Sequence, residues 1–339
     1  MLQLKNRTPF DAKFSLFPNE QGIDTLYLMI KASFKIGHDW ILTDKQISPF
    51  IKDEYWGELN DSSIKYGSDY HIGKSATDII VMGNAYVPDN KLARQLDVNV
   101  SVGEATKTIR VFGDRVWKNG HISPPEPFQQ MELVYERAFG GKHERDKKDS
   151  NGDGEGLLVE PRNPIGRGFA GKRSLSEMNG IALPNLEDPN DLIKTHKDAP
   201  EPACFAFISP SWQNRQQYAG TYDEAWQTGR SPYLPDDFDK RFFNAAHRQL
   251  IYPSFLQGGE GVNITHMHPD GDLTFNLPQF QPIAEVDISD KLLRLMFQIE
   301  TVLIQPNQME LSLVWRASLP CDKNGLKIKD INIVLPRKI

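Results

Sequence analysis

The sequence predicts a mainly β protein, an α+β chain with few short helices. In it, antiparallel sandwich-like sheets at both ends flank a long, irregular middle rich in proline and glycine. Two observations lead to this prediction. Apolar and polar residues alternate with period two near both ends, as in strands that bury one face. Residues 120–290 are dense in proline, glycine and asparagine, which confines them to short elements joined by turns.

The longest alternating pattern predicts a strand over residues 25–36. Lys31, Ser33 and Lys35 share one face, so we expect that face to be exposed and the strand to be half-buried. The opposite face is apolar throughout and consists of Leu26, Leu28, Ile30, Ala32, Phe34 and Ile36.

Two hairpins are also predicted. Residues 96–102 and 107–113 alternate on either side of a turn near Gly103, and residues 78–87 before them predict a further strand. The second hairpin lies near the C-terminus, where residues 292–304 and 309–317 flank a short turn.

Helix signals are few and local. Thr221 and Glu224 form a capping-box pattern, and Gly229 stands where the helix would end. A second helix is expected within residues 236–250, beginning at Asp236 or Asp237.

The length of 339 residues predicts about two domains of roughly 150 residues each. The charged, glycine-rich stretch 142–156 is the expected boundary. We therefore expect an N-terminal β domain over residues 1–145 and a mixed, mainly β domain with a loop-rich first part over residues 146–339. A single compact unit is the alternative.

Composition excludes some classes of function. A net charge of −6 argues against a nucleic-acid binder, and no apolar run approaches the roughly 18 residues that cross a bilayer. The N-terminal residues show no apolar signal-peptide core, and the chain has only two cysteines, Cys204 and Cys321. These features predict a cytoplasmic protein with no nucleic-acid partner and no membrane insertion.

Residues 149–160, DSNGDGEGLLVE, match the calcium-loop pattern D-x-[DN]-x-[DN]-G-x5-E. Its oxygen ligands would be Asp149, Asn151, Asp153 and Glu160. The flanking stretches AFGGK and PRNPIGRG do not favour the helices of an EF-hand, so we interpret the match as a polar linker and only a weak candidate metal site.

Other site motifs also fail. Between Gly67 and Gly73 lies one residue too many for a phosphate-binding P-loop, so residues 67–75 are expected to form a polar loop. His266 and His268 could ligate zinc, but no third zinc ligand lies nearby in the sequence. Cys204 lies in an apolar run and is expected to be a core thiol. We therefore expect no enzyme activity and no cofactor.

Several loops combine arginine, glycine and aromatic residues. Such residues lock loops together through guanidinium hydrogen bonds and stacking, and the same types form interface hot spots. Structural locking is the favoured interpretation, with binding as the alternative. The residues concerned are Asp114, Arg115, Trp117, Arg137, Gly140, Gly141, Asn163, Pro164, Gly166, Trp212, Arg215 and Trp226.

These loops follow one another in a recognisable order. The ordered motifs are DIIVMGNAYVP, TIRVFGDRVW, YERAFGG, NPIGRGF, LPNLEDP, SWQNR, GTYDEAW and FDKRFFNAA. Over residues 5–317 the chain resembles a bacterial family first catalogued as a domain of unknown function. Members of that family act as adaptors, or chaperones, for type VI secretion effectors.

The resemblance implies an accessory role in the cytoplasm. Such a protein binds an effector and helps load it onto the spike protein, with or without the tip protein of the spike. The family pattern carries no catalytic residues. Two other hypotheses remain: an enzyme whose site assembles from Asp114, Arg115, Arg137, Asn163 and Arg167, and a calcium-dependent structural protein. The neighbouring genes would discriminate between the three.

Overall fold

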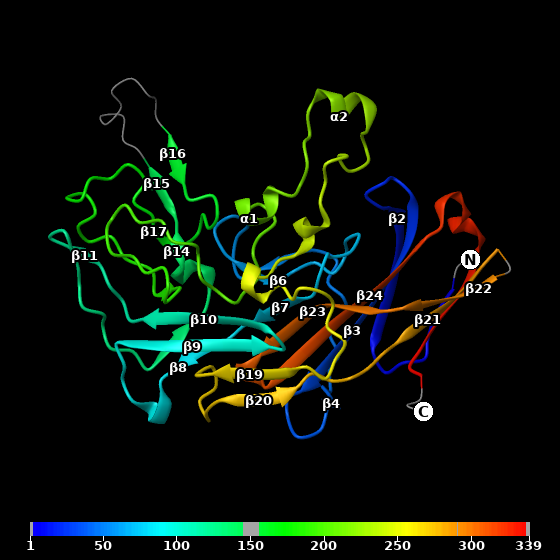
Figure 1. Ribbon diagram of the computed structural model, residues 1–339, viewed down its shortest axis with the longest axis horizontal. Helices are drawn as coiled ribbons and strands as arrows, with labels where there is room; N and C mark the ends of the chain where they lie inside the picture. The colour runs from blue at the N-terminus through cyan, green and yellow to red at the C-terminus, as the bar shows by residue number, and fades with distance from the viewer. Residues whose placement is uncertain (1–2, 145–155, 290, 337–339) are drawn as a thin grey trace.

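The computed structural model describes residues 3–144, 156–289 and 291–336, and it is mainly β, as predicted (Figure 1). The central sheet has six strands, of which five follow the order β2-β3-β24-β23-β7 and the sixth, β4, pairs with β3. Only the β23–β7 pair is parallel. The strands of the central sheet are β2 (Asp11–Pro18), β3 (Asp24–Lys35), β4 (Ile41–Leu42), β7 (Asp78–Val81), β23 (Gln298–Gln305) and β24 (Glu310–Pro320).

Two further sheets lie beside the central one. A five-stranded antiparallel sheet has the order β18-β10-β9-β19-β20, and a four-stranded sheet has the order β1-β25-β21-β22. The first comprises β9 (Gln95–Val102), β10 (Ala105–Phe112), β18 (Leu186–Glu187), β19 (Gly261–Thr265) and β20 (Leu273–Asn276). The second comprises β1 (Gln3–Asn6), β21 (Ile283–Ile288), β22 (Lys291–Met296) and β25 (Ile328–Val334).

The remaining elements are short. Two-stranded pairs are β5 (Glu54–Tyr55) with β6 (Ile64–Tyr66), β8 (Asn84–Tyr86) with β13 (Gln130–Glu132), β11 (Trp117–Lys118) with β12 (His121–Ile122), β14 (Phe139–Gly140) with β17 (Arg167–Gly168), and β15 (Lys142–Glu144) with β16 (Leu157–Val159). The α-helices are α1 (Gln213–Gln216) and α2 (Glu224–Gly229); α2 lies at the end of an arm at the top of Figure 1. Single 3-10 turns are η1 (Pro88–Asn90), η2 (Tyr135–Arg137), η4 (Lys240–Phe243), η5 (Arg248–Leu250), η6 (Pro306–Gln308) and η7 (Asp322–Lys327).

Both predicted hairpins are present. Strands β9 and β10 pair from Gln95 with Phe112 to Val102 with Ala105, and β23 pairs with β24. The strand expected over residues 78–87 is wrong in extent, because it divides into β7 and β8. Residues 292–304 likewise divide, into β22 and β23, at the buried Phe297.

Strand β3 is present as predicted, but the expectation that it is half-buried is wrong. Lys31 is 3% exposed and Ser33 is 1% exposed, so both faces are covered at these positions, whereas Lys35 at the end of the strand is exposed as expected. The reason is tertiary: Lys31 pairs with Asp69 at 2.9 Å, and the Ser33 backbone bonds to the side chain of Gln46. Period-two alternation identifies the apolar face but carries no information on what covers the polar one.

The helix predictions are only partly right. Helix α2 ends at Gly229, but Asp223, and not Thr221, caps it by accepting from the Trp226 amide. Thr221 instead donates to Asp237 at 2.7 Å. No helix begins at Asp236 or Asp237; the described residues there form the short turns η4 and η5. Local hydrogen bonds of Asp and Thr side chains compete with helix capping, which explains both errors.

The main hydrophobic core extends across the three sheets. Phe10 stacks on Trp315 with ring centroids 5.6 Å apart, and Phe34 stacks on Phe280 at 5.5 Å. The six-stranded sheet joins β2, β3 and β7 to β23 and β24, from opposite sides of the expected boundary at residue 145. The division into two domains stays a prediction. Within the described part of the chain, no helix has the length and apolar character needed to cross a bilayer.

Leu28 on β3 is fully buried, so Leu28→Ala should lower the free energy of unfolding by about 2–5 kcal/mol through lost burial and a residual cavity. Urea unfolding followed by circular dichroism measures this. The control is Leu292→Ala on β22, where the side chain is 63% exposed and the expected change is within about 0.5 kcal/mol. Equal losses for both would contradict the assignment of Leu28 to the core.

Candidate functional site

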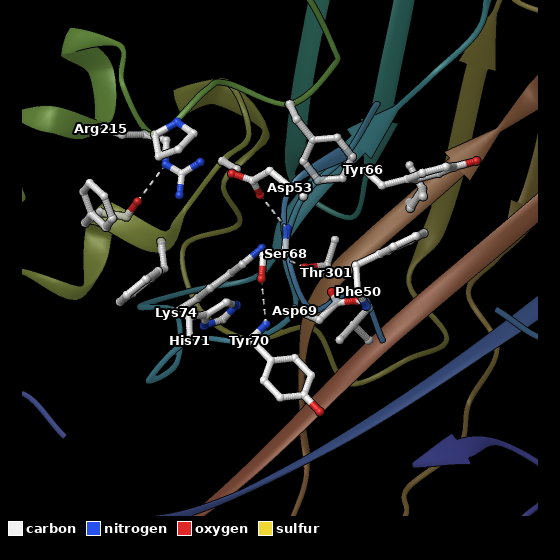
Figure 2. Close-up of a pocket in the computed structure, with 18 of the residues that line it drawn as sticks. Phe50, Asp53, Tyr66, Ser68, Asp69, Tyr70, His71, Lys74, Arg215 and Thr301 are labelled. Atoms are coloured by element: carbon white, nitrogen blue, oxygen red, sulfur yellow. Dashed lines mark hydrogen bonds between the residues drawn. The ribbon is translucent and has the colours of Figure 1, made fainter. Parts of the chain in front are cut away.

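Two cavities are lined by many polar side chains. The first is an inner chamber of about 160 Å³ between the central sheet and the loops that cover it (Figure 2). The second is a larger, more open groove of about 580 Å³. The chamber lies over β3 and β23, whereas the groove lies beside β8, β13 and the turn η6.

The inner chamber is closed by ion pairs. Lys74 donates to Asp78 and to Thr301, each at 2.7 Å, and both partners are buried. Lys31 pairs with Asp69 at 2.9 Å and also lies 4.1 Å from the ring centroid of Phe50. Each buried lysine therefore has its own counter-charge, which is the arrangement that makes buried charge tolerable.

Arg316 and Glu300 form a third buried pair, with an Arg Nε to Glu Oε2 distance of 2.5 Å. The other carboxylate oxygen of Glu300 accepts from the backbone amide of Lys74 at 2.8 Å. Strands β23 and β24 are thus joined to the loop that precedes β7. The loop over residues 67–75 is present as predicted, but its Asp69, His71 and Lys74 are buried and are not a solvent-facing polar surface.

Arg215 is the least neutralised cation of the chamber. It donates to the backbone carbonyls of Phe242 at 2.8 Å and Ile208 at 2.9 Å and forms no ion pair among the described residues (Figure 2). Burial lowers the pKa of its guanidinium, and the charges of Asp53 and Asp78 oppose that shift. Arg215 therefore joins α1 to the turn η4.

Two histidines are held neutral in and near this region. Burial, with the charges of Arg316 and Lys74, lowers the pKa of His71 well below its usual value. Burial, with the charge of Lys107, lowers the pKa of His247 to about 2. Each imidazole Nδ1 accepts from a nearby backbone amide, of Gly73 and of Gln249 respectively, so the neutral form is also the hydrogen-bonded one.

The open groove has a different character. Trp56 lines it with 55% of its surface exposed, and Arg137 and Arg167 lie at its wall. Its other lining residues include Asn84, Glu132, Glu136, Gln305, Asn307 and Gln308. It combines an accessible aromatic ring with cationic and amide groups, a combination typical of recognition surfaces.

Asn185 positions the two arginines of the groove. Its side-chain oxygen accepts from Nη1 of Arg137 at 3.3 Å and from Nη1 of Arg167 at 3.2 Å. Its amide nitrogen donates to the Phe112 carbonyl at 3.1 Å and to Asp114 at 2.9 Å. One neutral, fully buried side chain thus orients both guanidinium groups.

Among the described residues, Glu136 forms no ion pair with these arginines. Its two carboxylate oxygens accept from the backbone and the hydroxyl of Ser63 at 2.8–3.0 Å, while its backbone carbonyl accepts from Arg167 Nε at 3.0 Å. The segment that carries Trp56 is thereby linked to the wall that carries the arginines.

A family model described as "Uncharacterized protein conserved in bacteria (DUF2169)" matches residues 21–316. The chain belongs to this bacterial family. No curated protein and no solved structure matches the sequence.

The residues proposed for an enzyme site within this family member are only partly brought together. Asp114, Arg137 and Arg167 meet around Asn185. Arg115 points elsewhere: it is 6% exposed and pairs with the fully buried carboxylate of Glu187. The remaining member of the set, Asn163, is also buried, and its side-chain amide donates to two backbone carbonyls.

Asn163 and the glycines Gly140, Gly141 and Gly166 form a tightly packed cluster that supports the groove. The Asn163 amide donates to the carbonyls of Tyr135 at 2.8 Å and Phe139 at 2.9 Å. A Cβ on Gly140 would approach the Asn163 carbonyl oxygen to 2.0 Å, and one on Gly166 would approach the Asn163 side chain to 2.4 Å. Gly141 adopts a φ of +111°, which disfavours larger residues, and Pro164 lies half-buried between these positions.

The tryptophans of the ordered motifs have separate roles. Trp117 lies in a small second core with Phe139, and Trp212 packs edge-on against Tyr135 at 5.0 Å. Trp226 is half-buried on α2, donates to the Tyr233 carbonyl at 2.8 Å and contacts Tyr222. Two of the three therefore stabilise the fold, and only Trp226 is on the projecting arm.

The calcium-loop residues Asp149, Asn151 and Asp153 lie outside the described residues. The fourth, Glu160, is buried and accepts from Arg162 Nε at 2.6 Å. The flanks AFGGK and PRNPIGRG hold the short strands β14 and β17 and no helix, as the sequence suggested. Across residues 3–144, 156–289 and 291–336, no group of three His, Cys, Asp or Glu side chains could hold a metal ion.

Cys204 is a buried free thiol, as predicted, and burial raises its pKa to about 12. Sequence reasoning missed Asn185 and Glu187. Both lie in the quoted motif LPNLEDP, and the signal available was a polar residue on each side of an apolar one in a short extended stretch. Their partners Arg137 and Arg115 lie far away in the chain, so spacing could not pair them.

Arg115→Ala should lower the free energy of unfolding by about 3–5 kcal/mol, because it leaves the buried Glu187 carboxylate unpaired. Thermal and urea unfolding measure this. The matched control is Arg110→Ala, which breaks a surface pair with Asp97 and should cost about 1 kcal/mol or less. An Arg115→Ala protein as stable as the parent would contradict the structural role of this pair.

Stability should fall in mild acid because His71 and His247 stay neutral in the folded protein. An unfolded histidine binds a proton near pH 6.5, so below that pH the unfolded state holds more protons than the folded one. Each residue then lowers the free energy of unfolding by up to about 1.4 kcal/mol per pH unit.

Urea unfolding at several pH values below neutrality measures that slope. His247→Asn should make it shallower, whereas the same change at the exposed His38 should leave it unaltered. An unchanged slope in His247→Asn would show that this imidazole does not remain neutral in the folded state.

Proposed function

We propose that this chain is a type VI secretion adaptor, or chaperone, that binds one cognate effector in the bacterial cytoplasm. It then helps load that effector onto the spike protein, the tip protein or both. The whole-chain order of arginine-, glycine- and aromatic-rich motifs supports the proposal, and membership of a bacterial family agrees with it.

The observation that carries the proposal is the groove. It has a volume of about 580 Å³ and presents Trp56, Arg137 and Arg167 from three separate segments. Tryptophan and arginine dominate the binding energy of protein interfaces when they are held in place. Here Asn185 and Ser63 fix the groove wall, so little conformational entropy is lost on binding.

The inner chamber favours a structural role over a catalytic one. Its lysines and Arg316 are bound to carboxylates, and its histidine is held neutral by burial. The convergence of Asp114, Arg137 and Arg167 is the observation that favours an enzyme as a second candidate. Asp114 accepts a hydrogen bond from Asn185 and is 71% exposed to solvent, so it is not held in a water-excluded site facing a substrate.

An adaptor must hold its client during assembly and release it on delivery. An affinity in the nanomolar to micromolar range, about −8 to −12 kcal/mol, meets both needs. A buried interface of about 1,600 Å² in total is large enough to supply it. The groove would be the centre of such an interface, with the surrounding loops as its rim.

Purification of the tagged protein from cells should recover the effector encoded beside its gene. Deleting the gene should abolish delivery of that effector while secretion of the spike continues, because the firing machinery is intact. Secretion of effector and spike is measured in culture medium, and the parent strain is the control. Recovery of no effector or spike component, together with normal delivery in the deletion strain, would refute the adaptor function.

A further inference from the structure

The arginine pair of the groove carries more positive charge than its surroundings neutralise. Arg137 and Arg167 share one neutral acceptor, the Asn185 oxygen, at 3.3 and 3.2 Å. Two guanidinium groups on one amide oxygen repel each other. Burial together with the charge of Arg137 lowers the pKa of Arg167, and the charges of Asp114 and Glu136 oppose that shift. The nearby carboxylates therefore offset the two positive charges only in part.

The carboxylates near the pair are already used or distant. Asp114 lies 4.0 Å from Arg137, is 71% exposed and accepts from Asn185. Glu136 accepts from Ser63 with both oxygens. Glu132 is exposed in the same groove and forms no ion pair with either arginine in the described structure. The carboxylates of the chain therefore neutralise Arg137 and Arg167 only in part.

Arg137 and Arg167 also have hydrogen-bond donors that no described residue uses. Arg137 uses only Nη1 toward other described residues, which leaves Nε and Nη2 unused. Arg167 uses Nε and Nη1, which leaves Nη2. Since both side chains line the groove, these donors are accessible to a ligand that enters it. Adjacent guanidinium donors match the two oxygens of a carboxylate.

We propose that Arg137 and Arg167 bind a carboxylate side chain of an acidic, extended segment of the partner protein, with Trp56 packing against a neighbouring side chain of that segment. This inference rests on the proposed adaptor function, because the partner is taken to be the effector. A groove of about 580 Å³ accommodates a few side chains of an extended segment and not a folded domain.

Charge also favours a protein carboxylate over nucleic acid. The chain carries a net charge of −6, and Glu132 and Glu136 line the same groove. A phosphate backbone needs a continuous row of cations, whereas a single carboxylate needs one well-placed pair. The pair therefore acts as a local recognition point within a larger interface.

The first experiment measures binding of the co-purified effector to Arg137→Gln and Arg167→Gln by titration calorimetry. Each variant should bind about tenfold to a hundredfold more weakly, the loss expected for a charge-assisted hydrogen bond. Arg110→Gln, a surface arginine outside the groove, is the matched control and should bind like the parent. Thermal unfolding identifies any variant that has lost its fold, and Arg137→Lys keeps the charge and should restore part of the affinity.

The second experiment separates this inference from the adaptor function. A fluorescent peptide of alternating glutamate and glycine is compared with its glutamine counterpart by anisotropy, at low and at high salt. Binding of the glutamate peptide alone, weakened by salt and by Arg137→Gln, supports carboxylate recognition even if no effector is captured.

Two outcomes would overturn the inference. One is effector binding that is unchanged in folded Arg137→Gln and Arg167→Gln proteins, which would leave the adaptor function intact but place the contact elsewhere. The other is equal binding, or no binding, of the two peptides together with failure to capture an effector, in which case both proposals fail.

Discussion

Lys31 and Ser33, on the polar face of strand β3, are covered by the protein itself, and the buried lysine requires a counter-charge in the interior. Lys31 meets Asp69, and the neighbouring strand contributes Arg316, which pairs with Glu300. Asp69, Glu300 and the backbone of Lys74 connect these pairs to the loop before β7. Removing any one partner would leave a buried charge unpaired, so the loops cannot separate from the sheet without a large loss of stability.

That constraint holds the loop before β7 against the central sheet. Arg115 extends the same principle to the segment after β10, through Glu187 and the Pro184 carbonyl. Asn163 does so without charge, by bonding two backbone carbonyls where glycines allow close approach. Arginine, asparagine and glycine in these loops therefore serve mainly to hold the loops in place. The groove is the space that remains between the fixed loops.

The two cavities illustrate how similar residues acquire different roles. In the chamber each lysine has a carboxylate within 2.9 Å, and burial keeps His71 uncharged. In the groove two arginines share an amide and face an accessible space beside Trp56. Satisfied buried charges contribute to the uniqueness of a fold, whereas unsatisfied accessible donors are available to a ligand.

The sequence by itself determined strand β3 and the hairpins β9–β10 and β23–β24, because alternation and turn residues act over a few positions. It also identified Cys204 as a core thiol and Arg115 as a locking residue. Only the tertiary structure decided that the polar face of β3 is buried, that Asp223 caps α2, and that Asn185 joins Arg137 to Arg167. Those outcomes depend on which distant segments meet, and a local pattern of residue types holds no record of the partner.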